Sequence, residues 1–373
     1  MATPTKGQSK APDRSPSGRV RPATVAQVRD FTGVAADFRV EWDVRPAFDF
    51  LFSLSPDAGS TDDLPADDRA WLDAARKGLD GKDSSPAAAM IREALGVHLG
   101  GFLVEHPEAA TSAQVVDAVR AGGPVAVLRW AFGDLLASTP GFGPIVDRAL
   151  AGDSQAAAEV TARAGSDKHG QRLDLLAGPG LVFDQTVALL ERWQPRFAEI
   201  EPRVRAILSR DYELRASDRA SLGGSDLIER TTGGVRVVPD ATVRRVILAP
   251  SYFSRPYNYL LGGEGWRFAG YPVADAALDL DPLSPPASVL RLHRALGDAT
   301  RLRILKLLAE KDRYGTEIAG ILDLSKPTIT HHLAQLRIAG LVTIVEAGAV
   351  TYYHLRRERL EQATGDLKSF LAR

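Results

Sequence analysis

The sequence predicts an α+β protein in which a mostly helical N-terminal body with a small β-sheet precedes a separate C-terminal domain. Apolar residues recur at helical spacing through much of the chain, for example in 112–121 and 154–164. Short runs rich in β-branched or aromatic residues at 235–238, 243–248 and 265–269 predict the small sheet. A proline-rich stretch, DPLSPPA, then interrupts the pattern. We therefore expect a body over 38–280, a linker over 281–287 and a C-terminal domain over 288–373.

The N-terminal segment has the composition of a disordered tail. Residues 1–35 are rich in Pro, Ser, Thr, Lys and Arg, and the first thirty residues carry a net charge of about +4. Either this basic tail is a solvated extension with no further role, or it tethers the chain to DNA without sequence preference. Order is expected to begin with a strand near 38–44, and later to include two helices at 181–193 and 195–216, divided at Pro195.

An aromatic-rich run in the second half of the body has two interpretations. Tyr, Phe, Trp and Arg are favoured both in ligand pockets and at partner-binding faces, but they also fill the core beneath a small sheet. The segment 251–266 is therefore predicted either as core or as a region for a small-molecule or protein effector. The residues concerned are Tyr252, Phe253, Arg255, Tyr257 and Trp266.

One stretch of the C-terminal domain, SKPTITHHLAQLRIAG, reads as a short helix with two unlike faces. Ser325 is a suitable N-cap, and Gly340 suits the positive φ that often ends a helix. Ile329, Leu333 and Leu336 share one apolar stripe. The opposite face is short or rich in hydrogen-bond donors, which suits phosphates and base edges. Its members, together with the cap, are the predicted DNA-binding residues Ser325, Lys326, Thr328, Thr330, His331 and Gln335.

The flanking segments turn this amphipathic helix into a helix-turn-helix. Residues 316–323 predict a short preceding helix, and Asp323 with Leu324 leaves room only for a tight turn. Residues 296–308 predict an earlier helix that starts near Asp298, and 341–355 predict a β-hairpin. A helix, a helix-turn-helix and a hairpin, in this order, form a winged helix, whose second short helix enters the major groove of DNA. The recognition helix is expected at 326–339.

The C-terminal domain resembles the ArsR family of bacterial regulators. The residues that carry the resemblance are ALGDATRLRILKLL at 295–308, SKPTITHHLAQLRIAGLV at 325–342 and TYYHL at 351–355. The resemblance implies a homodimeric, cytoplasmic, nucleoid-associated repressor that binds double-stranded DNA. It also implies that the first and last helices of the domain form the dimer, which assigns Leu290, Leu360 and Leu367 to dimerisation.

The charge distribution fits DNA binding by the C-terminal domain. The whole chain has a net charge of −1, but residues 288–373 carry a net charge of +5 and the remainder carries −6. A basic domain attached to an acidic body fits a local interaction with phosphates.

The sequence offers no constellation for catalysis or for a metal. The chain has no Cys, which excludes disulfides and thiolate metal sites, and no run of apolar residues is long enough to span a membrane. Some ArsR-type regulators hold a metal with Cys residues in the helix-turn-helix or with Asp and His on the last helix. Residues 316–322 have no Cys and 357–371 have no His. We therefore expect no catalytic residues, no metal and no cofactor.

The sequence thus predicts a sequence-specific DNA-binding transcriptional regulator that represses from a two-fold operator. Two other functions remain open. The body is a protein-interaction platform that the winged helix tethers to DNA, or the body is an enzyme with an appended DNA-binding domain. The effector, the operator and the regulated genes cannot be identified from the sequence.

Overall fold

The computed structural model describes residues 38–79, 96–139, 141–164, 173–236, 243–281, 283–347 and 350–372. The predicted tail, residues 1–35, lies outside the described residues. The α+β class predicted from the sequence is confirmed. Within the described residues, no helix is both long enough and apolar enough to cross a membrane.

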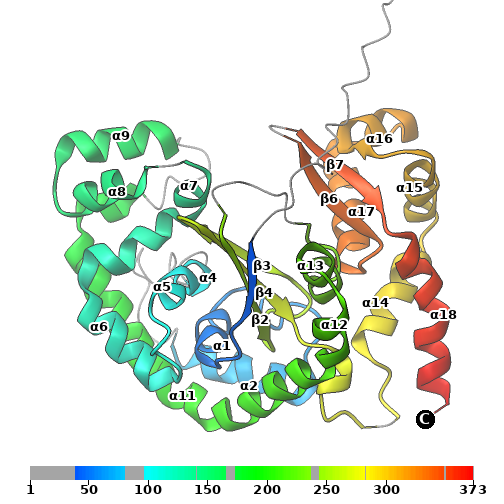
Figure 1. The fold of residues 1–373 in the computed structure, drawn as a ribbon, viewed down its shortest axis with the longest axis horizontal. Helices are drawn as coiled ribbons and strands as arrows, with labels where there is room; N and C mark the ends of the chain where they lie inside the picture. The colour runs from blue at the N-terminus through cyan, green and yellow to red at the C-terminus, as the bar shows by residue number, and fades with distance from the viewer. Residues whose placement is uncertain are drawn as a thin grey trace, which may run out of the picture. The chain divides into compact units, whose positions relative to one another are not determined.

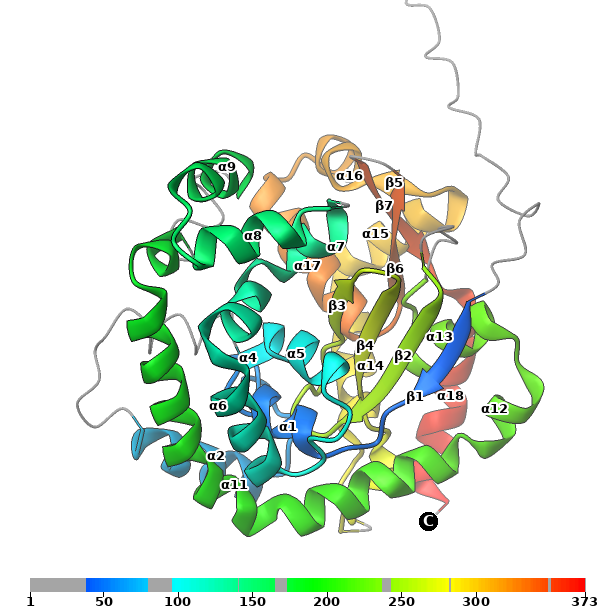
Figure 2. The same cartoon turned by 60° about the vertical axis from the view of Figure 1, so that its left-hand side comes forward.

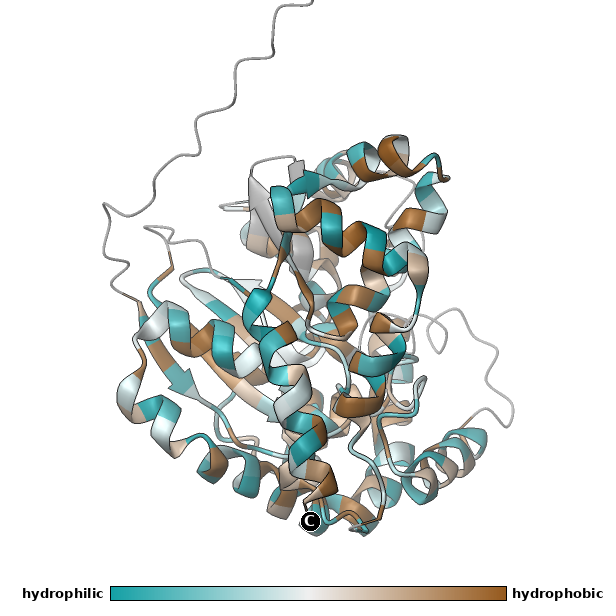
Figure 3. Cartoon of the chain, turned by 90° about the vertical axis from the view of Figure 1, so that its right-hand side faces the viewer, coloured by the Kyte–Doolittle hydropathy of each residue, from teal (hydrophilic) through white to brown (hydrophobic). Residues whose placement is uncertain are grey.

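Helices make up most of the body (Figure 1). In chain order they are α1 (Ala47–Phe52), α2 (Ala66–Lys77), α4 (Gly96–His98), α5 (Gly100–Glu105), α6 (Ser112–Leu128), α7 (Gly133–Ser138), α8 (Gly143–Leu150), α9 (Ser154–Ala164), α11 (Pro179–Leu214), α12 (Ala216–Ser221) and α13 (Gly224–Thr232). Hydrophobic and hydrophilic residues alternate around most of these helices, as expected when one face of a helix is buried (Figure 3).

The long helix α11 corrects one prediction, because the two helices expected at 181–193 and 195–216 are continuous. Pro195 and Pro202 both lie inside the helix and on its exposed side. Proline removes one helical hydrogen bond, but water can solvate the carbonyl group that is freed on an exposed face. Trp193 and Phe197 are fully buried on the opposite face, and this burial holds the helix together across the first proline.

The body sheet combines strands from both ends of the body. Its order is β1-β2-β4-β3, with bounds Arg39–Trp42, Arg245–Ser251, Trp266–Pro272 and Tyr259–Gly263 respectively. β1 and β2 are parallel, with Arg39 opposite Arg245, and β2 is also parallel to β4. β3 is antiparallel to β4. The sequence did not predict β3, and half of the strand expected at 235–238 lies outside the described residues.

Helices cover both faces of this sheet (Figure 2). One face packs on the main core of the body, where Phe48 of α1 lies 4.7 Å, centroid to centroid, from the ring of Phe268. The other face packs on α13 through Ile228 and Tyr271. This two-sided cover explains why β2 is buried at almost every position.

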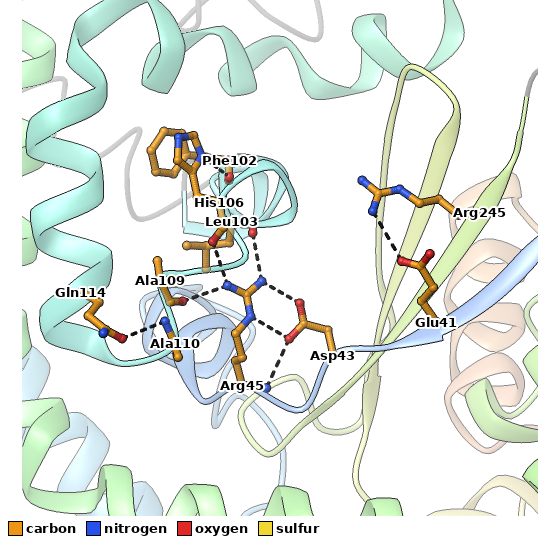
Figure 4. A network of polar contacts seen from close by, with 10 residues as sticks. All are labelled: Glu41, Asp43, Arg45, Phe102, Leu103, His106, Ala109, Ala110, Gln114 and Arg245. Carbon is orange, nitrogen blue, oxygen red and sulfur yellow. Dashed lines mark hydrogen bonds and ion pairs between the residues drawn. The ribbon is translucent and has the colours of Figure 1, made fainter.

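An arginine joins the end of β1 to the helices beside it (Figure 4). Arg45 forms an ion pair with Asp43 and donates hydrogen bonds of 2.9 Å to the carbonyl oxygens of Leu103, His106 and Ala109. The guanidinium group thereby ties the end of β1 to the last turn of α5 and to the segment that follows it.

The C-terminal domain is built around a second hydrophobic core. Its elements are α14 (Ala287–Leu296), α15 (Ala299–Glu310), β5 (Arg313–Tyr314), α16 (Gly315–Leu322), α17 (Lys326–Ile338), β6 (Val342–Ala347), β7 (Val350–Leu355) and α18 (Arg357–Leu371). The strands form an antiparallel sheet of order β5-β7-β6. This is the winged helix that the sequence predicts.

Candidate nucleic-acid interface

Local signals set both ends of α17. The side chain of Ser325 accepts a hydrogen bond of 3.3 Å from the backbone N–H of Thr328, as expected for an N-cap. Its hydroxyl also lies 2.7 Å from that of Thr328. After the helix, Gly340 adopts a φ of 73°, which places the chain in the left-handed region where glycine is favoured.

The two faces of α17 differ sharply in burial. Ile329, Leu333 and Leu336 are at most 1% exposed and lie in the core of the winged helix. The predicted DNA-binding face points away from this core. Its side chains are all exposed, namely Ser325, Lys326, Thr328, Thr330, His331 and Gln335. The helix therefore presents polar groups on a surface whose position the buried face holds fixed.

The turn before α17 depends on one left-handed residue. Asp323 ends α16 with φ 53° and ψ 50°. Aspartate tolerates this conformation better than most residues, because its short polar side chain can bond locally. The backbone N–H of Leu324 donates to the carbonyl oxygen of Ala319, which closes the turn. The helix α16 begins at Gly315, so Thr316 lies inside the helix and does not cap it.

A buried arginine fixes α16 against α15. Arg313 is 8% exposed and donates to Glu310 at 2.9 Å and to the carboxylate of Glu317. It also donates to the carbonyl oxygen of Leu307 at 3.2 Å. Because a buried guanidinium needs partners for all of its donors, this network favours a single arrangement of the two helices.

At its first turn, α15 also packs close to α17. The Asp298 carboxylate accepts from the backbone N–H of Arg301 at 2.8 Å, and this hydrogen bond holds the pKa of Asp298 below its usual range. His332 Nδ1 lies 3.8 Å from the same carboxylate. His332 is half-buried, whereas the neighbouring His331 is exposed. This difference indicates that His332 packs within the domain whereas His331 faces outward.

The other predicted residues fall in three kinds of surroundings. Leu290 is 36% exposed, whereas Leu360 packs against the winged-helix core of its own chain and Leu367 is half-buried. Tyr252, Phe253 and Trp266 are buried in the body core, and Tyr257 packs against it. Arg255 is 3% exposed and borders a cavity. The aromatic side chains therefore serve packing, and Arg255 faces a cavity large enough for a small molecule.

The contacts between the body and the winged helix join residues that lie far apart in the sequence. Arg356 donates to the carbonyl oxygens of Gly233, at the end of α13, and Gly340, at the end of α17. Asp275 accepts from the backbone N–H and the hydroxyl of Ser288, which lies in the first turn of α14. These residues meet only when the winged helix packs on the body, so local sequence patterns do not predict the contacts.

With this geometry in hand, the winged helix can be compared with known proteins. Residues 298–343 match the family described as "Bacterial regulatory protein, arsR family". The HTH-type transcriptional regulator KmtR of Mycobacterium tuberculosis is 33% identical over 93 residues, which are 25% of this chain and 72% of KmtR. The chain belongs to the arsR family.

Other relatives match about a fifth of this arsR-family chain. The HTH-type transcriptional regulator CmtR of Mycobacterium bovis is 37% identical over 81 residues, covering 22% of this chain and 69% of CmtR. The transcriptional repressor SdpR of Bacillus subtilis is 33% identical over 80 residues, covering 21% of this chain and 89% of SdpR. These relatives are named as transcriptional regulators, and the family match places the domain that they share at residues 298–343. Within the part of the chain that the structure describes, no three His, Asp or Glu side chains group into a metal site.

Proposed function

We propose that this protein is a sequence-specific transcriptional repressor that binds a two-fold operator as a homodimer through α17. The observation that carries the proposal is the burial contrast of that helix. An apolar face locked into a core holds the exposed polar face in a fixed orientation. A rigid helix of this kind can place several side chains against base edges at once.

The exposed face suits two kinds of contact. Lys326 lies at the start of α17, where free backbone N–H groups and the positive end of the helix dipole favour a phosphate. Thr328, Thr330, His331 and Gln335 lie further along. Glutamine can pair with adenine through two hydrogen bonds, and threonine methyl groups can touch thymine. Lys326 would thus position the helix and the later residues would read sequence.

Repression and dimerisation are supported by different observations. A relative that matches over 89% of its length carries the name transcriptional repressor. Leu290 on α14 is exposed in the single chain, as a dimer contact requires. A two-fold dimer would place its recognition helices about 34 Å apart, one turn of DNA. Sedimentation of the full chain at micromolar concentration should give a dimer, and a chain that is monomeric both free and on DNA would refute this part of the proposal.

The main test is genome-wide recovery of the DNA that the full chain binds in its own cells. We expect enriched sites that share a two-fold motif and lie at promoters whose transcription rises when the gene is deleted. The double variant His331→Ala/Gln335→Ala should lose these sites. Gln155→Ala, on an exposed face of α9 in the body, is the matched control and should keep them. Recovery of the same sites by the double variant would show that α17 does not select sequence.

A further inference from the structure

A cavity of about 500 Å³ lies where the winged helix meets the body. The body lines it with the end of α13, with the segments that follow β2 and β4, and with Asp63. The winged helix lines it with its first helix, α14, and its last helix, α18. The volume lies within the range that small-molecule sites occupy, roughly 300–1,000 Å³.

Arginines from different elements face this cavity. Arg255 follows β2, Arg291 belongs to α14 and Arg359 belongs to α18. Val273, Val289 and Phe370 add apolar surface to the lining. A cavity with convergent guanidinium groups and an apolar wall suits a small molecule that has an acidic group and a nonpolar part.

The carboxylates around the cavity already have partners in the protein. Asp275 pairs with Arg255 and Ser288, and Asp366 pairs with Arg359 at 2.6 Å. Asp63 accepts from Thr61 at 2.7 Å and contacts Arg291. These acceptors are therefore poorly available to a cationic ligand.

Two donors, in contrast, remain without an acceptor. Among the described residues, neither Nε of Arg291 nor the hydroxyl of Thr231 has a hydrogen-bond partner, although both atoms are buried. Burial, followed by the like charge of Arg359, lowers the pKa of Arg291 to about 10, so this group is still cationic at neutral pH. A buried donor without an acceptor costs free energy, and an anionic ligand would supply the missing acceptors.

We propose that this junction cavity binds a small anionic effector, with a carboxylate or phosphate group held by Arg291 and Thr231, and that its binding changes the affinity for DNA. The second half of this statement rests on the proposed function, whereas the binding itself does not.

The contacts around the cavity provide the coupling. Gly233 lines the cavity, and its carbonyl oxygen accepts from Arg356, which also donates to Gly340 at the end of the recognition helix. Arg359 lies three residues after Arg356, at the start of α18. On the other side, Asp275 holds the first turn of α14 through Ser288. A ligand that contacts both the body and the winged helix has a different affinity for each arrangement of these two parts. This difference in affinity couples the cavity to the DNA-binding helix.

The first test measures anion binding by the full chain without DNA. Inorganic phosphate, pyrophosphate and citrate serve as probes, at constant ionic strength set with chloride. We expect saturable binding of at least one probe at millimolar concentration or below, by calorimetry and as a rise in melting temperature. Arg291→Gln and Thr231→Val should each weaken the affinity by about tenfold, the value of one lost charge-assisted hydrogen bond.

The controls separate a built site from general charge effects. Arg294→Gln removes a cation from the same helix, but its side chain is 65% exposed, so binding should not change. Thr231→Val replaces a hydroxyl with a methyl group of similar size, so this variant should fold. It keeps the test decisive if the Arg291→Gln variant fails to fold. Binding of none of the three probes, or equal binding by all variants, would overturn the proposal.

The second test measures coupling. The probe that binds should change the affinity of the wild-type chain for its operator, and it should leave Arg291→Gln unaffected. If the probe binds with no change in DNA affinity, the coupling is refuted and the site remains. If instead the chain binds the probe but selects no DNA sequence, the proposed function fails alone, because the first measurement contains no DNA.

Discussion

Replacement of Gln335 by alanine tests whether α17 reads bases. Gln335 is exposed, and alanine is at least as good a helix former as glutamine, so the fold should not suffer. A bidentate contact to a base contributes about 1–3 kcal/mol of discrimination, which corresponds to roughly 5- to 150-fold in affinity. We expect a loss of this size on the operator and little change on a scrambled duplex.

The assay is equilibrium binding to both duplexes at several salt concentrations. Lys326→Ala is the contrasting variant, because loss of a phosphate contact should weaken both duplexes alike and reduce the slope of log affinity against log salt by about one unit. Gln335→Ala should leave that slope unchanged. Equal losses on operator and scrambled DNA for Gln335→Ala would refute base reading by this helix.

Three further predictions concern stability and metals. Leu333→Ala should lower the free energy of unfolding of the winged helix by about 2–5 kcal/mol, measured by circular dichroism in denaturant, because Leu333 is 1% exposed; a change within error would mean that the site collapses around the missing atoms. DNA affinity should not respond to micromolar zinc, nickel or cadmium, since the chain has no Cys and 357–371 have no His; release from the operator in a metal titration would contradict this. Burial raises the pKa of Asp49 to about 6, despite hydrogen bonds from Ser251, Tyr252 and Phe253. Its ionisation therefore opposes folding above pH 6, and the wild type should gain about 1 kcal/mol over Asp49→Asn as the pH falls from about 7 to about 5. Parallel pH profiles for the two proteins in denaturant titrations would rule this out.

Local signals made the winged helix predictable. Ser325, Asp323 and Gly340 each satisfy a backbone requirement within a few residues, and the stripe from Ile329 to Leu336 needs only helical periodicity. The resulting element bounds therefore follow from short stretches of sequence.

The body depends on contacts that such stretches do not contain. β1 pairs with β2 across about two hundred residues, with Arg39 opposite Arg245, and no local pattern encodes this register. β3 was missed because two of its five residues are glycines, which are depleted in strands. Pro195 predicted a break in the helix because proline has a low helix propensity. That propensity does not show that the burial of Trp193 and Phe197 on the opposite face of α11 outweighs the lost hydrogen bond.

The candidate site divides in the same way. The exposed face of α17 was predictable from spacing, because it lies opposite an apolar stripe on one helix. The cavity was not, since Thr231, Arg255 and Arg291 come together only after three separate elements have packed. The charge and aromatic content near Arg255 pointed to a segment that borders the proposed cavity, but the neighbouring aromatic side chains belong to the core.

The bonds from Arg356 and Asp275 have a practical consequence for anyone who dissects this protein. A fragment that begins near the linker would lose the carboxylate of Asp275 from the first turn of α14, and Arg356 would lose one of its two carbonyl partners. Such a fragment exposes groups that evolved beside the body, so its melting temperature and DNA affinity describe a different molecule. A fragment extended back to Gly224 would regain α13, β4 and Asp275, but it would lack β1, which pairs with β2 in the body sheet. The winged helix of this chain is therefore best studied in place.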